Sequence, residues 1–202
     1  MTFLKDLILN GKIPHLILIR KATLFLWILP ILIYLFTDIH FVEYGKLGWN
    51  ILIAIMLIRP LSDVIPNLKI LKTLVLFRKE FGILSGVLIA IHSYKYFALG
   101  NKNILIEIFN PKYWDFNTIF GWGMAGFIIT IILLLTSNNF SIRLLKNSWK
   151  KFQELSYLLF LFSAIHIALV KKGDINEILL PVLLVMILWL MAKFKIIIFK
   201  TK

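Results

Sequence analysis

Residues 81–99 read FGILSGVLIAIHSYKYFAL, an apolar run in which Lys95 is the one formally charged residue. At about 1.5 Å of rise per residue, a helix of this length spans close to 30 Å, which is the thickness of the hydrocarbon core of a bilayer. The run therefore predicts a transmembrane helix. It also places His92 inside the membrane, where ionisable side chains are costly and are usually functional.

Similar apolar runs lie on both sides of this stretch. Hydrophobic residues make up 60% of the 202 residues, whereas soluble domains are about 45–50% apolar. We therefore expect an all-α integral membrane bundle of six transmembrane helices, forming a single domain over residues 1–202. The predicted spans are roughly 16–36, 47–65, 81–99, 119–135, 152–170 and 178–198. The second span is the weakest, because Arg59 and Pro60 cut it short.

The basic residues predict the orientation of the bundle. The N-terminus, the second and fourth connections and the C-terminal end together carry 17 of the 23 Lys and Arg residues, and the other connections carry 6. Cytoplasmic loops hold an excess of such residues, so both termini are predicted to be cytoplasmic. The net charge of +13 is thus explained by a lipid bilayer as partner. No RNA-binding motif accompanies it, and we expect no nucleic acid.

Two of the four histidines, His92 and His166, lie well inside apolar runs, and the chain contains no cysteine. The third and fifth spans run in the same direction, because one full crossing separates them. His92 follows Phe81 by 11 residues and His166 follows Phe152 by 14. Both side chains are therefore expected at a similar depth, in the half of the membrane nearer the exterior.

Two imidazoles at one depth on parallel helices could ligate a flat cofactor between them, and haem is the natural candidate. Two axial imidazoles fill the coordination sphere of the iron and favour electron transfer. Two histidines without nearby cysteines or carboxylates make a poor zinc site. The alternative interpretation is that each histidine only donates a hydrogen bond to a neighbouring helix.

Two stretches carry a resemblance to a known family. Residues 78–82 read RKEFG and precede His92, and Thr136-Ser137 precede a series formed by Arg143, Leu145, Trp149, Tyr157 and His166. These stretches resemble ferric-reductase-like transmembrane domains. Within that family they are most similar to the haem-binding membrane subunit of the bacterial periplasmic methionine-sulfoxide reductase system. The resemblance covers roughly residues 20–175.

The resemblance implies haem b, with His92 and His166 as its axial ligands near the periplasmic side. It implies a redox subunit in the bacterial inner membrane that takes electrons from membrane quinol, with or without a flavin. The acceptor would be a periplasmic molybdenum-containing reductase that repairs oxidised methionine. The subunit itself is not expected to hold the substrate-reducing site.

Members of the wider superfamily, such as the oxidase and eukaryotic ferric-reductase branches, hold a second haem one level deeper, and this chain departs from them there. The extra ligands of those relatives fall at Arg78 and Gln153 here, and neither side chain is a good haem ligand. We therefore expect one haem, and a quinone or a flavin such as FMN near Arg78, Trp149 and Gln153. Lys146 also replaces a glycine that is usual in the family, so the fourth connection is expected to turn differently.

Two other functions stay open at this point. One is a ferric-reductase-like haem protein that serves another acceptor, because Gln153 departs from the family pattern. The other is a small transporter without a cofactor, which would need polar residues along a path through the membrane. Only a few residues follow the sixth span, so electrons are expected from quinol or from a separate protein rather than from an attached NADPH domain.

Overall fold

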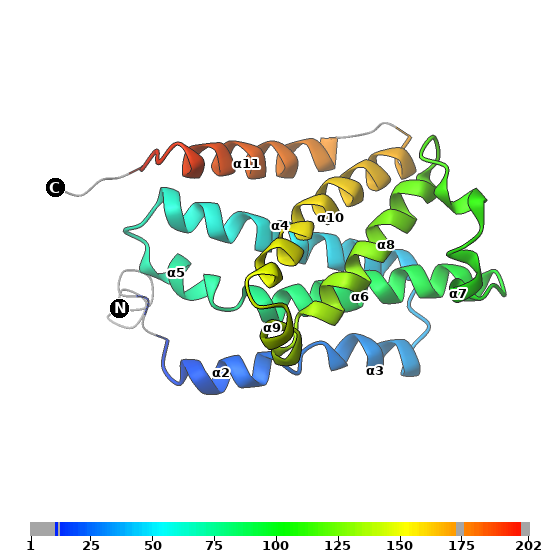
Figure 1. The fold of residues 1–202 in the computed structure, drawn as a ribbon, viewed down its shortest axis with the longest axis horizontal. Helices are drawn as coiled ribbons and strands as arrows, with labels where there is room; N and C mark the ends of the chain where they lie inside the picture. Colours follow the sequence, from blue (N-terminus) through cyan, green and yellow to red (C-terminus); the bar gives the residue numbers. More distant parts are fainter. Residues whose placement is uncertain (1–10, 12, 173–175, 199–202) are drawn as a thin grey trace.

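The computed structural model describes residue 11, residues 13–172 and residues 176–198, and these form helices and connections without a strand (Figure 1). The all-α prediction is thereby confirmed. The described elements are α2 (Leu16–Thr23), α3 (Ile28–Phe36), α4 (Phe41–Val64), α5 (Lys69–Val75), α6 (Arg78–Leu99), α7 (Ile104–Glu107), a 3₁₀ turn (Pro111–Trp114), α8 (Ile119–Thr136), α9 (Asn139–Leu145), α10 (Ser148–Val170) and α11 (Asn176–Lys193).

Among the described residues, five segments are long and apolar enough to cross a bilayer: Leu16–Phe36, α4, α6, α8 and α10. A shorter apolar helix, Ile178–Lys193, follows them and corresponds to the predicted sixth span. Each spanning segment and α11 also carries large apolar side chains that are exposed, for example Leu35, Leu47, Leu99, Leu135, Leu161 and Leu180. Lipid is the solvent that tolerates such a surface. The protein is a multi-pass membrane protein.

The centre of the bundle is built from two helix pairs, α4 with α6 and α8 with α10, which make the most extensive contacts in the structure. Trp49 of α4 and Phe160 of α10 join the two pairs, since their rings stack with centroids 5.1 Å apart and planes at 16°. Both side chains are buried in the larger apolar core. Figure 1 shows that α6 and α10 run in the same direction, as the alternation of spans predicts.

The first span contains a local break. Between α2 and α3 the backbone hydrogen bonds change from the i→i−4 to the i→i−3 pattern of a 3₁₀ turn. Leu26 N donates to Thr23 O at 3.1 Å, and Leu29 N donates to Leu26 O at 3.2 Å. Pro30 explains the change, because it has no N–H with which to bond Leu26 O. The segment still forms one candidate span, Leu16–Phe36.

The second and sixth spans have different bounds from those predicted. The second begins at Phe41 and continues through Pro60 to Val64, so the Arg59-Pro60 pair does not cut the helix short. The sixth ends at Lys193 and not at residue 198. Lys195 there has a left-handed backbone with φ of 55°, and Ile196 N donates to Met191 O at 2.9 Å. This is the pattern of a helix that ends in a Schellman-type cap.

Two ion pairs attach the N-terminal part of the described chain to α6. Arg20 of α2 contacts Glu80 near the start of α6, with Nε and Oε1 2.9 Å apart and the Glu80 side chain 2% exposed. Near the other end, Lys95 Nζ lies 2.8 Å from Asp38 Oδ1 and 2.6 Å from the Ile39 carbonyl oxygen. Each pair joins one buried charge to a more exposed partner.

Candidate functional site

His92 of α6 and His166 of α10 lie next to each other, as their positions in the sequence predict. The centroids of their rings are 6.4 Å apart and the ring planes meet at 76°. Both residues are partly buried between the two helix pairs. The bundle therefore brings together two imidazoles that are 74 positions apart in the chain.

Each of these rings is held by one backbone carbonyl. His92 Nδ1 lies 2.9 Å from the Phe41 carbonyl oxygen, and His166 Nδ1 lies 2.8 Å from the Ile119 carbonyl oxygen. A carbonyl oxygen only accepts hydrogen bonds, so Nδ1 must donate and must carry the proton in both rings. Nε2 then holds the lone pair, which is the tautomer that a metal ligand needs.

The separation of the rings fits a single iron between them. Two metal–imidazole bonds of about 2 Å, together with roughly 1 Å from each nitrogen to its ring centre, place the centroids about 6 Å apart. The observed separation is 6.4 Å. Among the described residues there is no group of three or more His, Cys, Asp or Glu that could hold a metal ion, so a zinc-type site lacks its ligands there.

A cavity of about 520 Å³ lies between the same helices, on the side where α6 and α10 begin. Its walls are largely apolar, and α4, α5, α6, α8 and α10 all contribute to them. The three residues predicted at an inner site, Arg78, Trp149 and Gln153, all line it. The structure thus brings these three together, while their part in binding a ligand stays a prediction.

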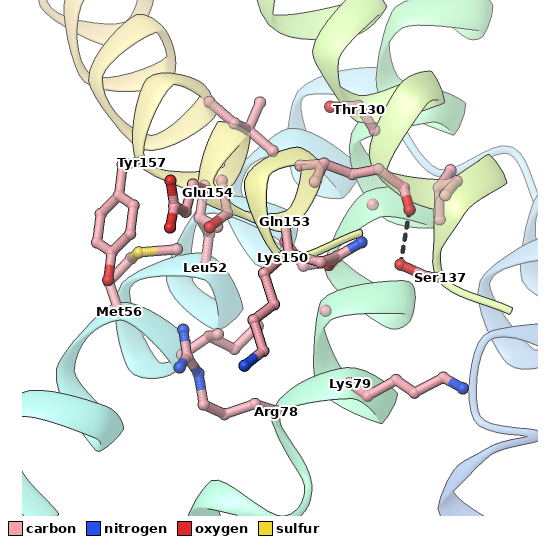
Figure 2. Close-up of a pocket in the computed structure, with 18 of the residues that line it drawn as sticks. Leu52, Met56, Arg78, Lys79, Thr130, Ser137, Lys150, Gln153, Glu154 and Tyr157 are labelled. Atoms are coloured by element: carbon pink, nitrogen blue, oxygen red, sulfur yellow. Dashed lines mark hydrogen bonds between the residues drawn. The ribbon is translucent and has the colours of Figure 1, made fainter. Parts of the chain in front are cut away.

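Arg78 is a lining residue with a buried hydrogen-bonding group that is unmet. Its Nε is buried and has no hydrogen-bond partner among the described residues. Figure 2 shows the guanidinium extending from the start of α6 toward Met56 and Tyr157, with the Lys150 ammonium nearby. The neighbouring Lys79 points away from them in this view, and its Nζ donates to Asn139 Oδ1 at 3.3 Å.

Trp149 and Gln153 are fixed by the end of α8. The indole Nε1 of Trp149 donates to the Thr136 carbonyl oxygen at 2.9 Å, and Gln153 Nε2 donates to the Thr136 hydroxyl at 3.2 Å. The indole N–H is therefore already used within the protein. Trp149 is better described as a support for the wall of the cavity than as a hydrogen-bond donor to a ligand.

Along their helices, the stacked residues Trp49 and Phe160 lie between the histidines and the cavity. Along α4, Trp49 lies between Phe41, which binds His92, and Leu52, which lines the cavity. Along α10, Phe160 lies between His166 and the cavity residue Leu159. The four central helices thus carry two levels, which we name after the predicted orientation: the outer level, with the histidines, and the inner level, with the cavity.

Sequence reasoning did not find the two carbonyls that hold the histidines, or the lining residue Glu154. Every residue has a backbone carbonyl, so no sequence motif could have identified those of Phe41 and Ile119 as partners of the histidines. Glu154 follows Gln153 directly, and only the packing of α10 shows that it reaches the cavity (Figure 2).

Comparison with known protein families gives one match that covers more than half of the chain. Residues 44–164 match the family of the ferric reductase like transmembrane component. The chain belongs to this family. The matched residues include His92 and end two positions before His166. The family resemblance read from the sequence is confirmed.

Curated relatives of this ferric-reductase-like chain are named protein-methionine-sulfoxide reductase heme-binding subunit MsrQ. The relative from Agrobacterium fabrum is 31% identical over 122 residues, which are 58% of this chain and 52% of the relative. Those from Brucella ovis and Brucella canis are 29% identical over 152 residues, 74% of this chain and 66% of each relative. The chain thus spans about half to two-thirds of the length of these relatives. No solved structure gives a significant match.

Proposed function

We propose that the protein is a haem b-binding electron-transfer subunit, with His92 and His166 as the axial ligands. The observation that carries this proposal is the pair of rings 6.4 Å apart, each with Nδ1 bonded to a carbonyl. In both rings Nε2 is thereby left as the nitrogen that can bind a metal. Axial ligation by two imidazoles leaves no vacant position for oxygen, so the site suits electron transfer rather than oxygen chemistry. The relatives named as heme-binding subunits support the same cofactor.

The protein residues would orient the haem and keep water away from it. When bound, a haem accepts and passes on single electrons, which is chemistry that no side chain here supplies. His92 and His166 would hold it between the helix pairs, and the Trp49–Phe160 stack closes the inner side of the site. One haem is proposed, because Arg78 and Gln153 occupy the inner level where relatives with two haems have ligands.

The inner cavity would receive the electron donor, and a membrane quinol is the donor that we propose. Its volume of about 520 Å³ lies within the range of small-molecule sites. Apolar walls suit the ring and tail of a quinol, and the unpaired Nε of Arg78 offers a hydrogen bond to one quinone oxygen. A flavin such as FMN is the alternative ligand, because Arg78 and Lys150 could also meet a phosphate.

The acceptor would be a periplasmic methionine-sulfoxide reductase that carries molybdenum, with the protein in the bacterial inner membrane and both termini in the cytoplasm. The names of the relatives support a link to that system. Oxidation of a quinol to a quinone releases two electrons and two protons. Reduction of a sulfoxide to a thioether consumes two of each and yields water, so the two half-reactions balance. A different acceptor is the alternative, because the chain covers only part of those relatives.

The decisive experiment is an absorption spectrum of the detergent-purified protein, first oxidised and then reduced with dithionite. We expect a six-coordinate b-type spectrum with one haem per chain. His92→Ala and His166→Ala should each abolish it, because either change removes one of two iron ligands. A colourless wild-type protein after expression with ample haem would overturn the proposal, and two haems per chain would overturn the single-haem assignment.

A further inference from the structure

Each of the two histidine rings lies against a glycine. A Cβ added at Gly45 would lie 2.8 Å from His92 Nδ1 and 3.1 Å from Cε1 and Cγ of the same ring. A Cβ added at Gly123 would lie 3.0 Å from His166 Nδ1 and 3.1 Å from its Cε1. These separations are shorter than side-chain carbons normally adopt, so any larger residue at either position would have to displace the ring.

The glycine and the carbonyl that holds each ring belong to the same helix and have the same spacing. His92 bonds the carbonyl of Phe41, four residues before Gly45 in α4. His166 bonds the carbonyl of Ile119, four residues before Gly123 in α8. The two helix pairs therefore present the same arrangement, which we call the histidine seat: a carbonyl at position i and a glycine at i+4.

Helix geometry explains why the glycine stands at i+4. In an α-helix the N–H of residue i+4 bonds the carbonyl of residue i, so the two groups lie one above the other. The Cβ of residue i+4 is tilted toward the N-terminus, over that carbonyl. An imidazole that approaches the carbonyl from a neighbouring helix must cross this position, and glycine leaves it empty.

We propose that Gly45 and Gly123 are positioning residues for the two axial histidines, which deepens the proposed haem-binding function and rests on it. A methyl group at either position pushes the ring away from its carbonyl. The Nδ1–H bond then lengthens or breaks, and Nε2 leaves the position in which it would bind the iron. The iron–imidazole bond weakens, and the imidazole loses the partner that raises its basicity.

A third glycine provides a matched control. Gly126 lies in α8, three residues after Gly123, and a Cβ there would meet only Leu159 Cδ1 at 3.8 Å, an ordinary contact. Alanine is thus accommodated at 126 and is not accommodated at 123, although the two positions share one helix and one depth range. The shorter separation at Gly45 predicts a larger effect there than at Gly123.

The experiment compares Gly45→Ala, Gly123→Ala and Gly126→Ala with the wild-type protein, each purified in detergent. We expect haem affinity to fall about 10- to 100-fold in the first two variants, as is typical when the partner of a metal-bound histidine is lost. The absorption spectrum of the haem that remains bound should contain a partial high-spin component, because the axial bond is weaker. The midpoint potential of this haem should rise, because a less basic imidazole stabilises ferric iron less. Gly126→Ala should match the wild-type protein in all three measurements.

A second comparison separates positioning from folding. In His92→Gly, free imidazole added to the buffer can take the place of the ring, and it is not tethered to α6. A free imidazole can shift to avoid a methyl group at position 45. His92→Gly combined with Gly45→Ala should therefore recover its low-spin spectrum with imidazole as well as His92→Gly alone, even if Gly45→Ala by itself accumulates poorly.

Each outcome bears on the proposal in a defined way. A haem-loaded wild-type protein with unchanged Gly45→Ala and Gly123→Ala variants would overturn the histidine seat and leave the proposed function standing. Failure of imidazole to rescue the double variant, where it rescues His92→Gly, would show that Gly45 acts through folding and would also overturn it. A wild-type protein without haem would overturn the proposed function, and the seat with it.

Discussion

The outer and inner levels of the bundle use the same four helices in opposite ways. At the outer level the centroids of two imidazole rings lie 6.4 Å apart, and a backbone carbonyl bonds each ring. At the inner level Arg78 and Gln153 line a cavity of about 520 Å³ that remains between the helices. The outer level suits a tightly held group that does not exchange. The inner level suits a ligand that enters and leaves.

The two ion pairs on α6 also differ between the levels, because the buried partner has the opposite charge in each. At the inner level the buried partner is an anion, Glu80, and its Oε2 has no hydrogen-bond partner among the described residues. At the outer level the buried partner is a cation, Lys95, which donates both to Asp38 and to the Ile39 carbonyl. The outer buried charge is therefore better satisfied. Loss of its partner should cost less than the same loss at the inner level.

Replacement of Arg78 should have the largest effect, and it should impair the inner level without altering the outer one. Arg78→Met removes the proposed hydrogen bond to the donor, which for a charged group is worth about 1.5–3 kcal/mol, but it leaves both histidines in place. We expect the reduction of the haem by a soluble quinol analogue to slow by roughly 10- to 100-fold, with an unchanged absorption spectrum. Stopped-flow absorption measures both.

The adjacent Lys79 is the control for this variant. Its ammonium donates to Asn139, so Lys79→Met should remove a similar charge with an effect on the rate of no more than about twofold. Equal slowing in the two variants would mean that net charge, and not the Arg78 guanidinium, determines the rate. An altered haem spectrum in Arg78→Met would show that the two levels are not independent.

Breaking the inner ion pair should destabilise the protein without affecting the outer level. Arg20→Ala leaves the Glu80 carboxylate buried and unpaired. Because the Arg20 side chain is 43% exposed, water replaces part of the interaction, and we expect a loss of about 1–3 kcal/mol in stability. Thermal unfolding in detergent measures the loss. Arg20→Ala combined with Glu80→Gln should recover part of it, and no recovery would mean that Arg20 acts through its packing.

Breaking the outer ion pair should have a smaller effect that depends on pH. Lys95 donates a hydrogen bond to Asp38 and holds the pKa of that carboxyl below its usual value. A lowered carboxyl pKa in the folded state means that the pair stabilises above about pH 4, and that this contribution is lost as the pH falls further. Asp38→Asn should thus unfold at a slightly lower temperature than the wild-type protein at pH 7, and this difference should narrow as the pH falls below about 4.

The smallest expected effect concerns the turn that leads into α10. Lys146 has φ of 46° and ψ of −119°, a conformation that favours glycine. Its carbonyl accepts a hydrogen bond from Trp149 N, so this turn helps to place the inner wall. Lys146→Gly should raise stability by about 1 kcal/mol. Lys146→Ala should bring no such gain, because alanine keeps the Cβ, and equal gains in both would refute the backbone explanation.

Much of the fold followed from the sequence, because the bilayer imposes a length on each apolar run. The same constraint placed His92 and His166 at one depth before their contact was known. The helix ends were less predictable: Pro30 breaks the first span locally and Pro60 does not end the second, and hydropathy treats both prolines alike. Whether a proline ends a helix depends on the neighbouring hydrogen bonds, which appear only in three dimensions.

The candidate site was predictable to different degrees at its two levels. The outer histidines follow from residue type and spacing, whereas Arg78, Trp149 and Gln153 followed only from a family resemblance. Nothing in the sequence indicated that the carbonyls of Phe41 and Ile119 would bond the two histidines. The cavity also depends on which faces of α4, α8 and α10 meet, and pairings between distant helices are not encoded in any local pattern. The orientation in the membrane and the roles of the site residues stay predictions.

The histidine seats have a consequence for the order of biosynthesis. Each seat lies within one helix pair, so the residues of the first, in α4 and α6, are synthesised before those of the second, in α8 and α10. The second seat forms when α8 meets α10, without help from the first. Each half of the proposed site can therefore be complete before the cofactor is bound. Since the Trp49–Phe160 stack already joins the two helix pairs, a bound haem would bridge two half-sites that the protein alone brings together.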